Sequence, residues 1–413
     1  MAELSTLEPP AAAHGIPAHV APAPVHDFDL FDNPGMAKCP FSTVAKLHDG
    51  PDVFWSPTIL REGQGEGAWV VTRAELMRHI LQHPELFSSK GEAGFSKLID
   101  EDWDMIPLEV DPPRHTQFRQ LLNPILYPRV VSQMTPGVIA RADELIDPIA
   151  KGNGCEFMEA FGRPFPISIF MQLMGLPLDQ MPIFLVWEED LLHSTSLVRR
   201  KAAAKAIRLY LETLAADRRA NPTDDLASLV VTSKIDGRLF TDDEVIGTLY
   251  LFFVGGLDTV ASSLGWFFHH LATHPEQQQW LRDNPDEIPH AVEELLRRFS
   301  VVTSRRQCTQ DTEVGGVKMK QGDWISLTYS LASLDPREFD NPLDVDFTRK
   351  GVRHFGFSFG PHFCIGSHLA RREMAVALRQ WLARIPQWRL KPGAPVLMHG
   401  GGVFGVERLE LEW

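Results

Sequence analysis

The sequence predicts a mainly helical protein with a small β region, and three observations support this fold class. Apolar residues recur with a helical period from about Asp111 to Arg298, which covers the middle of the chain. Short stretches of alternating polarity, bounded by turn residues, lie nearer the two ends. No internal repeat and no Gly/Ser-rich linker divides the 413 residues, so one large folded unit is expected.

The individual elements follow from these patterns. Helices are expected over residues 138–146, 200–219, 241–273 and 289–299, most of them bounded by Pro, Asp or Gly. Strands are expected within residues 52–72, 309–326 and 403–413. The Ala/Pro/His-rich residues 1–35 are expected to form a flexible arm, and residues 36–413 a single domain.

Composition and charge exclude several classes of protein. A hydrophobic content of 44% and a charged content of 23% are typical of a soluble globular protein. The net charge of −14 argues against nucleic-acid binding, which needs a basic surface. The N-terminus has no signal-peptide pattern, and no apolar run reaches the roughly twenty residues needed to cross a bilayer. Four cysteines without CxxC spacing favour a reducing cytoplasm.

One of these cysteines, Cys364, lies on a glycine-flanked turn directly before a helix pattern. The backbone N–H groups and dipole of a helix N-terminus favour a thiolate there. Gly360 and Gly366 allow a flat cofactor to approach the backbone, and Phe357 can lie against its face. The pattern indicates a thiolate ligand to haem iron. The alternative is a buried structural cysteine, which leaves the fixed glycines, histidine and aromatics unexplained.

The helix expected over residues 241–273 contains a second informative segment. Gly255 and Gly256 weaken a helix interior by about 1 kcal/mol each, so they need a reason. Thr259 follows Gly255 by four residues, and its hydroxyl can compete for the carbonyl of that glycine and open the helix. Asp258 then places an ionisable group beside the opening. A tightly packed helix crossing is the alternative explanation for the small residues.

The arrangement Phe-x-x-Gly-x-His-x-Cys-x-Gly, from Phe357 to Gly366, resembles the haem-binding loop of the cytochrome P450 family. The resemblance implies the triangular, α-rich prism fold and haem b with Cys364 as the metal ligand. It also implies that Asp258 and Thr259 are the catalytic residues, which deliver protons while O2 is activated. Four residues match the family's contacts to the haem propionates: His115, Arg119, Arg306 and His362. The group Glu294, Arg297 and Arg349 matches a structural ion pair of the family.

Within the family the chain is most similar to the bacterial camphor hydroxylases. The segments that carry this similarity are Ile106-Pro107 before Asp111-Pro112-Pro113, Pro164–Ile167, Gly255–Val260, Glu293–Ser300 and His368–Glu373. The position of a tyrosine that holds the substrate ketone matches Trp103, and two polar pocket positions match Leu108 and Ser304. The other expected substrate contacts are Leu251, Val254, Gly255, Val302 and Val403. This altered pocket favours a terpenoid or norisoprenoid, such as an ionone-like ketone, over camphor.

The resemblance also predicts the partners. The chain has no flavin or nicotinamide fingerprint, so a [2Fe–2S] ferredoxin and a flavin-dependent reductase are expected to supply electrons, with docking near Arg78, Arg114, Arg119 and Arg372. A soluble cytoplasmic monomer of bacterial type is expected. Relatives hold the acid at position 258 with basic residues, but here the matching segment offers only His193. A peroxygenase or isomerase and a non-catalytic haem sensor are the alternatives; the Asp258–Thr259 pair favours the monooxygenase.

Overall fold

The computed structural model describes residues 16–20, 24–60 and 67–413, and it confirms the mainly helical class. The helices are α1 (Pro40–Ala45), α2 (Ala74–Gln82), α3 (Phe95–Leu98), α4 (Arg114–Leu122), α5 (Pro128–Ile149), α6 (Pro164–Met174), α7 (Met181–Glu188), α8 (Leu197–Ala220), α9 (Leu226–Thr232), α10 (Asp242–Leu257), α11 (Thr259–Ala272), α12 (Pro275–Asp283), α13 (Ile288–Arg298), α14 (Tyr329–Ser333) and α15 (Ser367–Arg384). The helices predicted at residues 138–146 and 200–219 fall within α5 and α8. Those predicted at 241–273 and 289–299 match α10–α11 and α13 to within one residue at each end.

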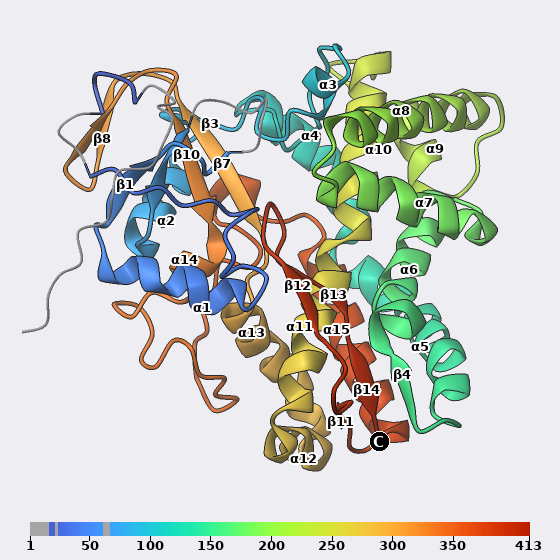
Figure 1. The fold of residues 1–413 in the computed structure, drawn as a ribbon. Coiled ribbons are helices and arrows are strands. Elements are labelled where there is room, and N and C mark those ends of the chain that lie inside the picture. The colour runs from blue at the N-terminus through green and yellow to red at the C-terminus, as the bar shows by residue number, and fades with distance from the viewer. Residues whose placement is uncertain (1–15, 21–23, 61–66) are drawn as a thin grey trace, which may run out of the picture.

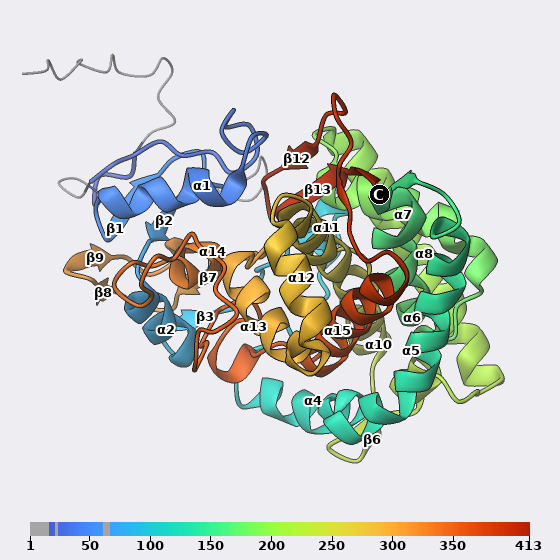
Figure 2. The same ribbon diagram turned by 90° about the horizontal axis from the view of Figure 1, so that it is seen from below.

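The strands are β1 (Val53–Ser56), β2 (Ala68–Val71), β3 (Phe87–Ser88), β4 (Gly154–Glu156), β5 (Lys234–Ile235), β6 (Arg238–Leu239), β7 (Thr303–Cys308), β8 (Thr312–Val314), β9 (Val317–Met319), β10 (Trp324–Thr328), β11 (Arg389–Leu390), β12 (Leu397–His399), β13 (Gly405–Arg408) and β14 (Glu410–Glu412). Strands β1, β2, β8–β10, β13 and β14 lie within or overlap the predicted ranges, whereas the six-residue strand β7 and several short strands were not predicted. Figure 1 shows the largest sheet on one side of the molecule and helices α5–α9 on the other, with α10 and α11 running between them. The same division is visible from below in Figure 2.

The largest sheet has the strand order β1-β2-β10-β7-β3. Strands β2 and β10 pair in parallel, and the other pairs of this sheet are antiparallel. The sheet thus joins the N-terminal strands β1–β3 to β7 and β10, which follow α13 in the chain. In the β10–β7 register, Ser304 lies opposite Leu327 and Arg306 opposite Ile325. The sheet therefore fixes the positions of two predicted site residues.

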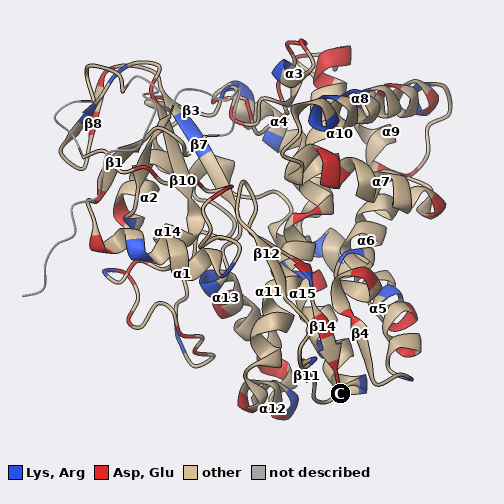
Figure 3. Ribbon diagram, viewed as in Figure 1, with Lys and Arg blue, Asp and Glu red and all other residues tan. Residues whose placement is uncertain are grey.

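The helix expected over residues 241–273 is broken into α10 and α11 at Asp258, which has φ −100° and ψ −45°. Thr259 Oγ1 donates to the Gly255 carbonyl at 3.3 Å, as the sequence suggested. Taken as one segment, Asp242–Ala272 is long and apolar enough to cross a membrane by composition alone, with a mean hydropathy of 1.5. However, 67% of its most apolar window is buried in the protein interior, and α11 carries no Lys, Arg, Asp or Glu (Figure 3). It is the central core helix of the fold.

Part of the predicted flexible arm packs on the body of the protein. Phe28 and Leu30 are buried, and the N–H of His26 donates to the carbonyl of Trp55 at 2.9 Å. These apolar side chains come after the Ala/Pro-rich stretch, and they supply the contact area that orders residues 24–35. Residues 1–15 and 21–23 of the predicted arm lie outside the described residues.

The predicted structural ion pair is fully buried. Arg297 donates through Nε and Nη2 to the two carboxylate oxygens of Glu294, both at 2.8 Å, and neither side chain is exposed. The remaining donors of Arg297 reach the carbonyls of Ser333, Pro342 and Asp344. Arg349 also contacts Glu294, at 3.3 Å. These bonds tie α13 to the irregular segment before the Cys364 loop.

Candidate active site

A cavity of about 490 Å³ lies within the fold, bounded by α10–α11, β7 and the Cys364 loop. Its lining is largely apolar. All but one of the predicted site residues line it: His115, Arg119, Arg306, Phe357, His362, Cys364, Gly366, Asp258, Thr259, Leu108, Leu251, Val254, Gly255, Val302, Ser304 and Val403. Leu30 and Phe31 of the N-terminal segment also line it, and nothing in the sequence had indicated this.

Cys364 is the one cysteine of the four that lines this cavity. Its N–H donates to the Phe357 carbonyl at 2.9 Å, and α15 begins three residues later. Burial raises the pKa of the thiol, while the N–H groups of Gly366 and Ser367 and the charge of Arg119 oppose that shift. A metal ion bound at this position would complete the stabilisation of the thiolate.

The cations and imidazoles predicted for the propionates converge on one end of the cavity. The rings of His115 and His362 lie 4.1 Å apart, centre to centre. Neither ring nitrogen of the buried His115 has a hydrogen-bond partner among the described residues. Burial and the nearby Arg119 lower the pKa of His115 to about 4, so its neutral ring offers one N–H donor. Unsatisfied donors beside two arginines fit the carboxylates of a haem.

Arg306 has a partner that sequence reasoning missed. It forms a short ion pair with Glu92, whose carboxylate also accepts a hydrogen bond from the Ser304 hydroxyl. The side chains of Arg306 and Glu92 are 3% and 9% exposed. No motif distinguishes Glu92 in the sequence, because its role depends on a loop that folds back onto β7. The hydroxyl of Ser304 is therefore engaged with Glu92 rather than directed freely into the cavity.

The two glycines of α10 have different structural roles. A Cβ atom at Gly256 would lie 2.2 Å from the Phe170 ring, so this glycine permits close packing of α10 against α6. A Cβ at Gly255 would meet no atom within 4 Å, and Gly255 lines the cavity. Both explanations of the Gly-Gly pair thus apply, one to each residue.

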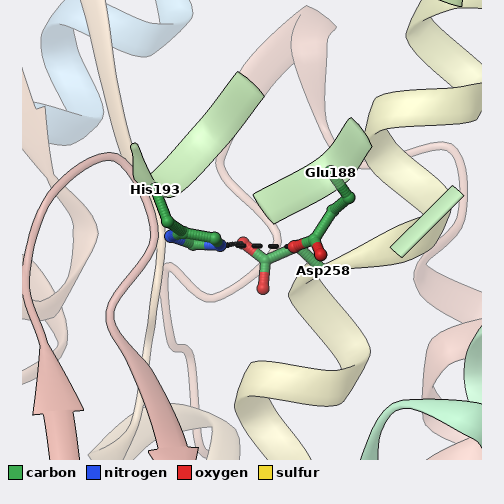
Figure 4. A group of neighbouring side chains, drawn as sticks. All are labelled: Glu188, His193 and Asp258. Carbon is green, nitrogen blue, oxygen red and sulfur yellow. Dashed lines mark hydrogen bonds and ion pairs between the residues drawn. The ribbon is translucent and has the colours of Figure 1, made fainter. Parts of the chain in front are cut away.

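Asp258 lies at the break between α10 and α11, and Figure 4 shows it beside His193 and Glu188. Its Oδ2 lies 3.4 Å from His193 Nε2, and that nitrogen lies 3.2 Å from Glu188 Oε1. Oδ1 accepts a 2.7 Å hydrogen bond from the Ser262 hydroxyl. Burial opposes ionisation of Asp258, but His193 and Ser262 lower its pKa to about 2. The expected contact of Asp258 with His193 is present, and Glu188 is an unpredicted third member.

Trp103 is the predicted substrate residue that does not line the cavity. It is 3% exposed, its indole N–H donates to the Glu101 carboxylate, and its ring packs against Tyr250 at 4.8 Å. The indole is larger than a phenol ring, and a carboxylate two residues earlier captures its single donor. Phe95, Met105 and Pro107 of the same loop line the cavity instead.

The predicted basic docking patch is smaller than expected. Arg114 pairs with Asp236 and Glu244, and Arg78 pairs with Glu338. Arg119 points toward the haem end of the cavity and donates to the Phe363 carbonyl at 2.7 Å. Arg372, on the first turns of α15, is exposed. Arg372 is therefore the main candidate for a charge contact on this face.

Comparisons with known proteins agree with this site. The model of the cytochrome P450 family matches residues 155–386. Probable cytochrome P450 127A1 from Sinorhizobium fredii is 43% identical over 404 residues, which covers 96% of this chain and 97% of that protein. Linalool 8-monooxygenase from Pseudomonas putida is 29% identical, with 85% of this chain and 90% of that protein covered.

Solved structures lead to the same family. The structure of cytochrome P450 CYP101C1 has a TM-score of 0.86 and 35% identity, and the match covers 97% of this chain and 100% of that one. CYP101J2 has a TM-score of 0.85 and 31% identity over the same shares. The chain belongs to the cytochrome P450 family: it is a monooxygenase, an oxidoreductase that binds haem b through a cysteine thiolate and uses O2 and redox partners.

Proposed function

We propose that this enzyme hydroxylates an unactivated C–H bond of a small hydrophobic terpenoid or norisoprenoid, with Cys364 as the haem ligand and Asp258 and Thr259 as the catalytic residues. One observation carries the proposal. A single apolar cavity is lined by Cys364, by the Asp258–Thr259 helix break and by the aliphatic side chains Leu108, Leu251, Val254, Val302 and Val403. The cofactor site, the proton-delivering residues and the substrate-binding site thus lie in the same cavity.

Thiolate-bound haem supplies the activation of O2, and the chain's own residues control protons and water around it. The Thr259 hydroxyl, which donates to the Gly255 carbonyl, lies at the opening of the helix and can pass a proton into the cavity. Asp258 is ionised at rest, so its Oδ2 relays the replacing proton from its partner His193. The apolar lining excludes bulk water, which limits proton leakage that would waste electrons.

The nature of the lining supports a terpenoid substrate. The indole N–H of Trp103 is held by Glu101, and the Ser304 hydroxyl by Glu92, so two donors that could anchor a ketone are engaged. Binding then depends mainly on apolar shape complementarity, which favours a larger ionone-like ketone over camphor. The similar Pseudomonas putida enzyme is named for linalool, a monoterpene alcohol, and this is consistent with the proposal.

The proposal includes a [2Fe–2S] ferredoxin and a flavin-dependent reductase as the electron source, and a soluble, cytoplasmic monomer. An exposed arginine at position 372, close to the Cys364 loop, suits an acidic partner. The buried position of Asp242–Ala272 is consistent with a protein that does not span a membrane.

A spectroscopic screen tests the substrate class. Purified holoenzyme is titrated with ionones, related terpenoid ketones and camphor, and the low-spin to high-spin shift is recorded, since it reports displacement of water by substrate. We expect a nearly complete shift with an ionone-like ketone and a small one with camphor. A full shift with camphor and none with ionones would overturn this substrate assignment.

A second experiment tests the ligand and the reaction type. Cys364→Ser is expected to lose the red-shifted CO spectrum of thiolate-bound ferrous haem, whereas the matched control Cys308→Ser keeps it, because Cys308 is buried outside the cavity. NADH-dependent product formation with a ferredoxin system then separates a monooxygenase from a peroxygenase, an isomerase and a sensor. A Cys364→Ser protein with an unchanged spectrum would refute the ligand assignment.

A further inference from the structure

Asp258 lies between two cavities. A second, much smaller cavity of about 20 Å³ borders Glu188, His193, Ser262 and His399, and Asp258 is the one described residue that lines both it and the large cavity. A volume of this size holds about one water molecule. Exposed Glu189 and Glu407 also border the small cavity, so its polar lining runs from the protein surface to Asp258.

Within this lining, one nitrogen connects two buried carboxylates. His193 Nε2 lies 3.2 Å from Glu188 Oε1 and 3.4 Å from Asp258 Oδ2, as Figure 4 shows. The side chains of Glu188 and Asp258 are 8% and 7% exposed. Because both carboxylates face the same nitrogen, a proton leaving Nε2 toward one of them can be replaced by a proton from the other.

Glu188, His193 and Asp258 differ in how readily they hold a proton. Burial raises the pKa of Glu188, and the negative Asp258 adds to this shift, although the hydrogen bond from His193 opposes it. Burial alone would lower the pKa of His193, but the two carboxylates raise it to about 11. One cation thus faces two carboxyl groups, and Glu188 is the carboxyl that takes up a proton more readily.

The same three ligand atoms lie within 4.8 Å of one another, a spacing that a metal ion can also bridge. Without a metal, however, the two carboxylates hold a proton on Nε2 of His193, and a metal ion would have to displace that proton to bind the nitrogen. The geometry and charge of this cluster therefore favour proton transfer over metal binding.

We propose that Glu188 is the proton-loading residue of this enzyme, passing protons from the small cavity through His193 Nε2 to Asp258. This rests on the proposed role of Asp258 as proton donor. His193 gives its Nε2 proton to the ionised Asp258 Oδ2, which passes it on toward the Thr259 hydroxyl, and Nε2 then takes the proton of the Glu188 Oε1–H group. A water in the small cavity gives the Glu188 carboxylate a new proton and takes one in turn from the solvent side. Protons and substrate thus reach Asp258 from different sides.

Glu188→Gln tests the proposal, with Glu276→Gln, an exposed glutamate on α12 that borders neither cavity, as the control. We expect Glu188→Gln to keep the CO spectrum and the substrate-induced spin shift but to lower turnover about tenfold. Its solvent deuterium isotope effect should rise, and more O2 should be consumed without product. Glu276→Gln should match the wild type. Wild-type turnover and isotope effect in Glu188→Gln would overturn the proposal.

A second variant leaves all the titratable groups in place. Ala261→Val adds volume to the wall of the small cavity and should produce the same defect, which keeps the proposal testable if Glu188→Gln does not fold. Wild-type kinetics in Ala261→Val would count against the path. Asp258→Asn distinguishes the role of Asp258 from that of Glu188. If Asp258→Asn leaves turnover unchanged, the catalytic role of Asp258 is refuted. If Asp258→Asn reduces turnover and Glu188→Gln does not, only the role of Glu188 is refuted.

A readout independent of turnover is the titration of His193, followed by histidine NMR. Removal of the Glu188 carboxyl group should lower the pKa of His193 measurably, while Glu276→Gln should leave it unchanged. An unaltered His193 titration in Glu188→Gln would contradict the coupling on which the relay depends. The other charged or titratable groups that border the small cavity are Arg163, Glu189, Asp258, His399 and Glu407.

Discussion

At the scale of single residues, the role of a side chain depends more on the residues it contacts than on its own residue type. The Asp258 carboxylate is held by a histidine rather than by an arginine or a lysine. An arginine stays charged at any accessible pH, whereas the charge of His193 depends on the carboxylates beside it. The proposed proton path therefore contains a group that can release its own proton.

His193→Ala should lower the rate of product formation by about tenfold or more and increase the share of O2 consumed without product, because the proton of Asp258 is no longer replaced through Nε2. Coupled assays of NADH, O2 and product measure both effects. His26→Ala, at an exposed position, serves as the control. An unchanged rate, coupling and pH profile would remove His193 from the mechanism.

At the scale of elements, the neighbouring glycines of α10 provide a matched pair of substitutions. Gly256→Ala places a methyl group within 2.4 Å of the Phe170 ring carbons and should lower the free energy of unfolding by about 1–3 kcal/mol. Gly255→Ala faces open space, so it should be stabilising or neutral, since alanine favours a helix by about 1 kcal/mol. Denaturation of the two variants side by side checks this. Equal stabilities would refute the packing role of Gly256.

The buried Glu294–Arg297 pair anchors the segment between α14 and the Cys364 loop. Arg297→Ala should lower the free energy of unfolding by about 3–5 kcal/mol, because it leaves Glu294 buried without its main partner and three carbonyls without a donor. Chemical denaturation and haem retention measure the effect. Arg282→Ala on α12 should change stability by no more than about 0.5 kcal/mol.

Most of the fold could be predicted from local patterns, because helix and strand periods depend on neighbouring residues. The break at Asp258 was also foreseen, since Thr259 and Gly255 are four residues apart. The engagement of Trp103 with Glu101 and of Ser304 with Glu92 could not be foreseen, because these contacts depend on how the loop over residues 89–109 folds. Glu188 could not be foreseen for a related reason: a buried carboxylate has no sequence signature that distinguishes it from an exposed one.

At the scale of the whole molecule, the His193 cluster makes stability depend on pH. The pKa of His193 rises from 6.5 in the unfolded chain to about 11 in the folded protein, so its contribution is complete below pH 6.5 and is lost as the pH rises toward 11. The stability difference between wild type and His193→Ala should fall by up to about 1.4 kcal/mol per pH unit over this range. Urea denaturation at pH 6, 7, 8 and 9 measures it, and a flat difference would contradict the raised pKa.

The face beside the Cys364 loop is where a redox partner is expected to dock. Arg372→Glu should raise the KM for an acidic ferredoxin several-fold and leave the substrate-induced spin shift unchanged. Arg379→Glu, farther along α15 and paired with Asp286, is the control. A KM that is the same in Arg372→Glu and wild type would place the docking surface elsewhere.

The position of Asp258 between two cavities has a consequence for how this enzyme can change. The large apolar cavity can be enlarged or narrowed at Leu108, Val254 or Val403, because none of these residues borders the small polar cavity. Among the described residues, the two cavities share only Asp258. Substrate range and proton supply can thus be tuned separately. A series of redesigned pockets that accept different substrates should keep a common solvent isotope effect, so that new selectivity need not cost efficiency in the use of O2.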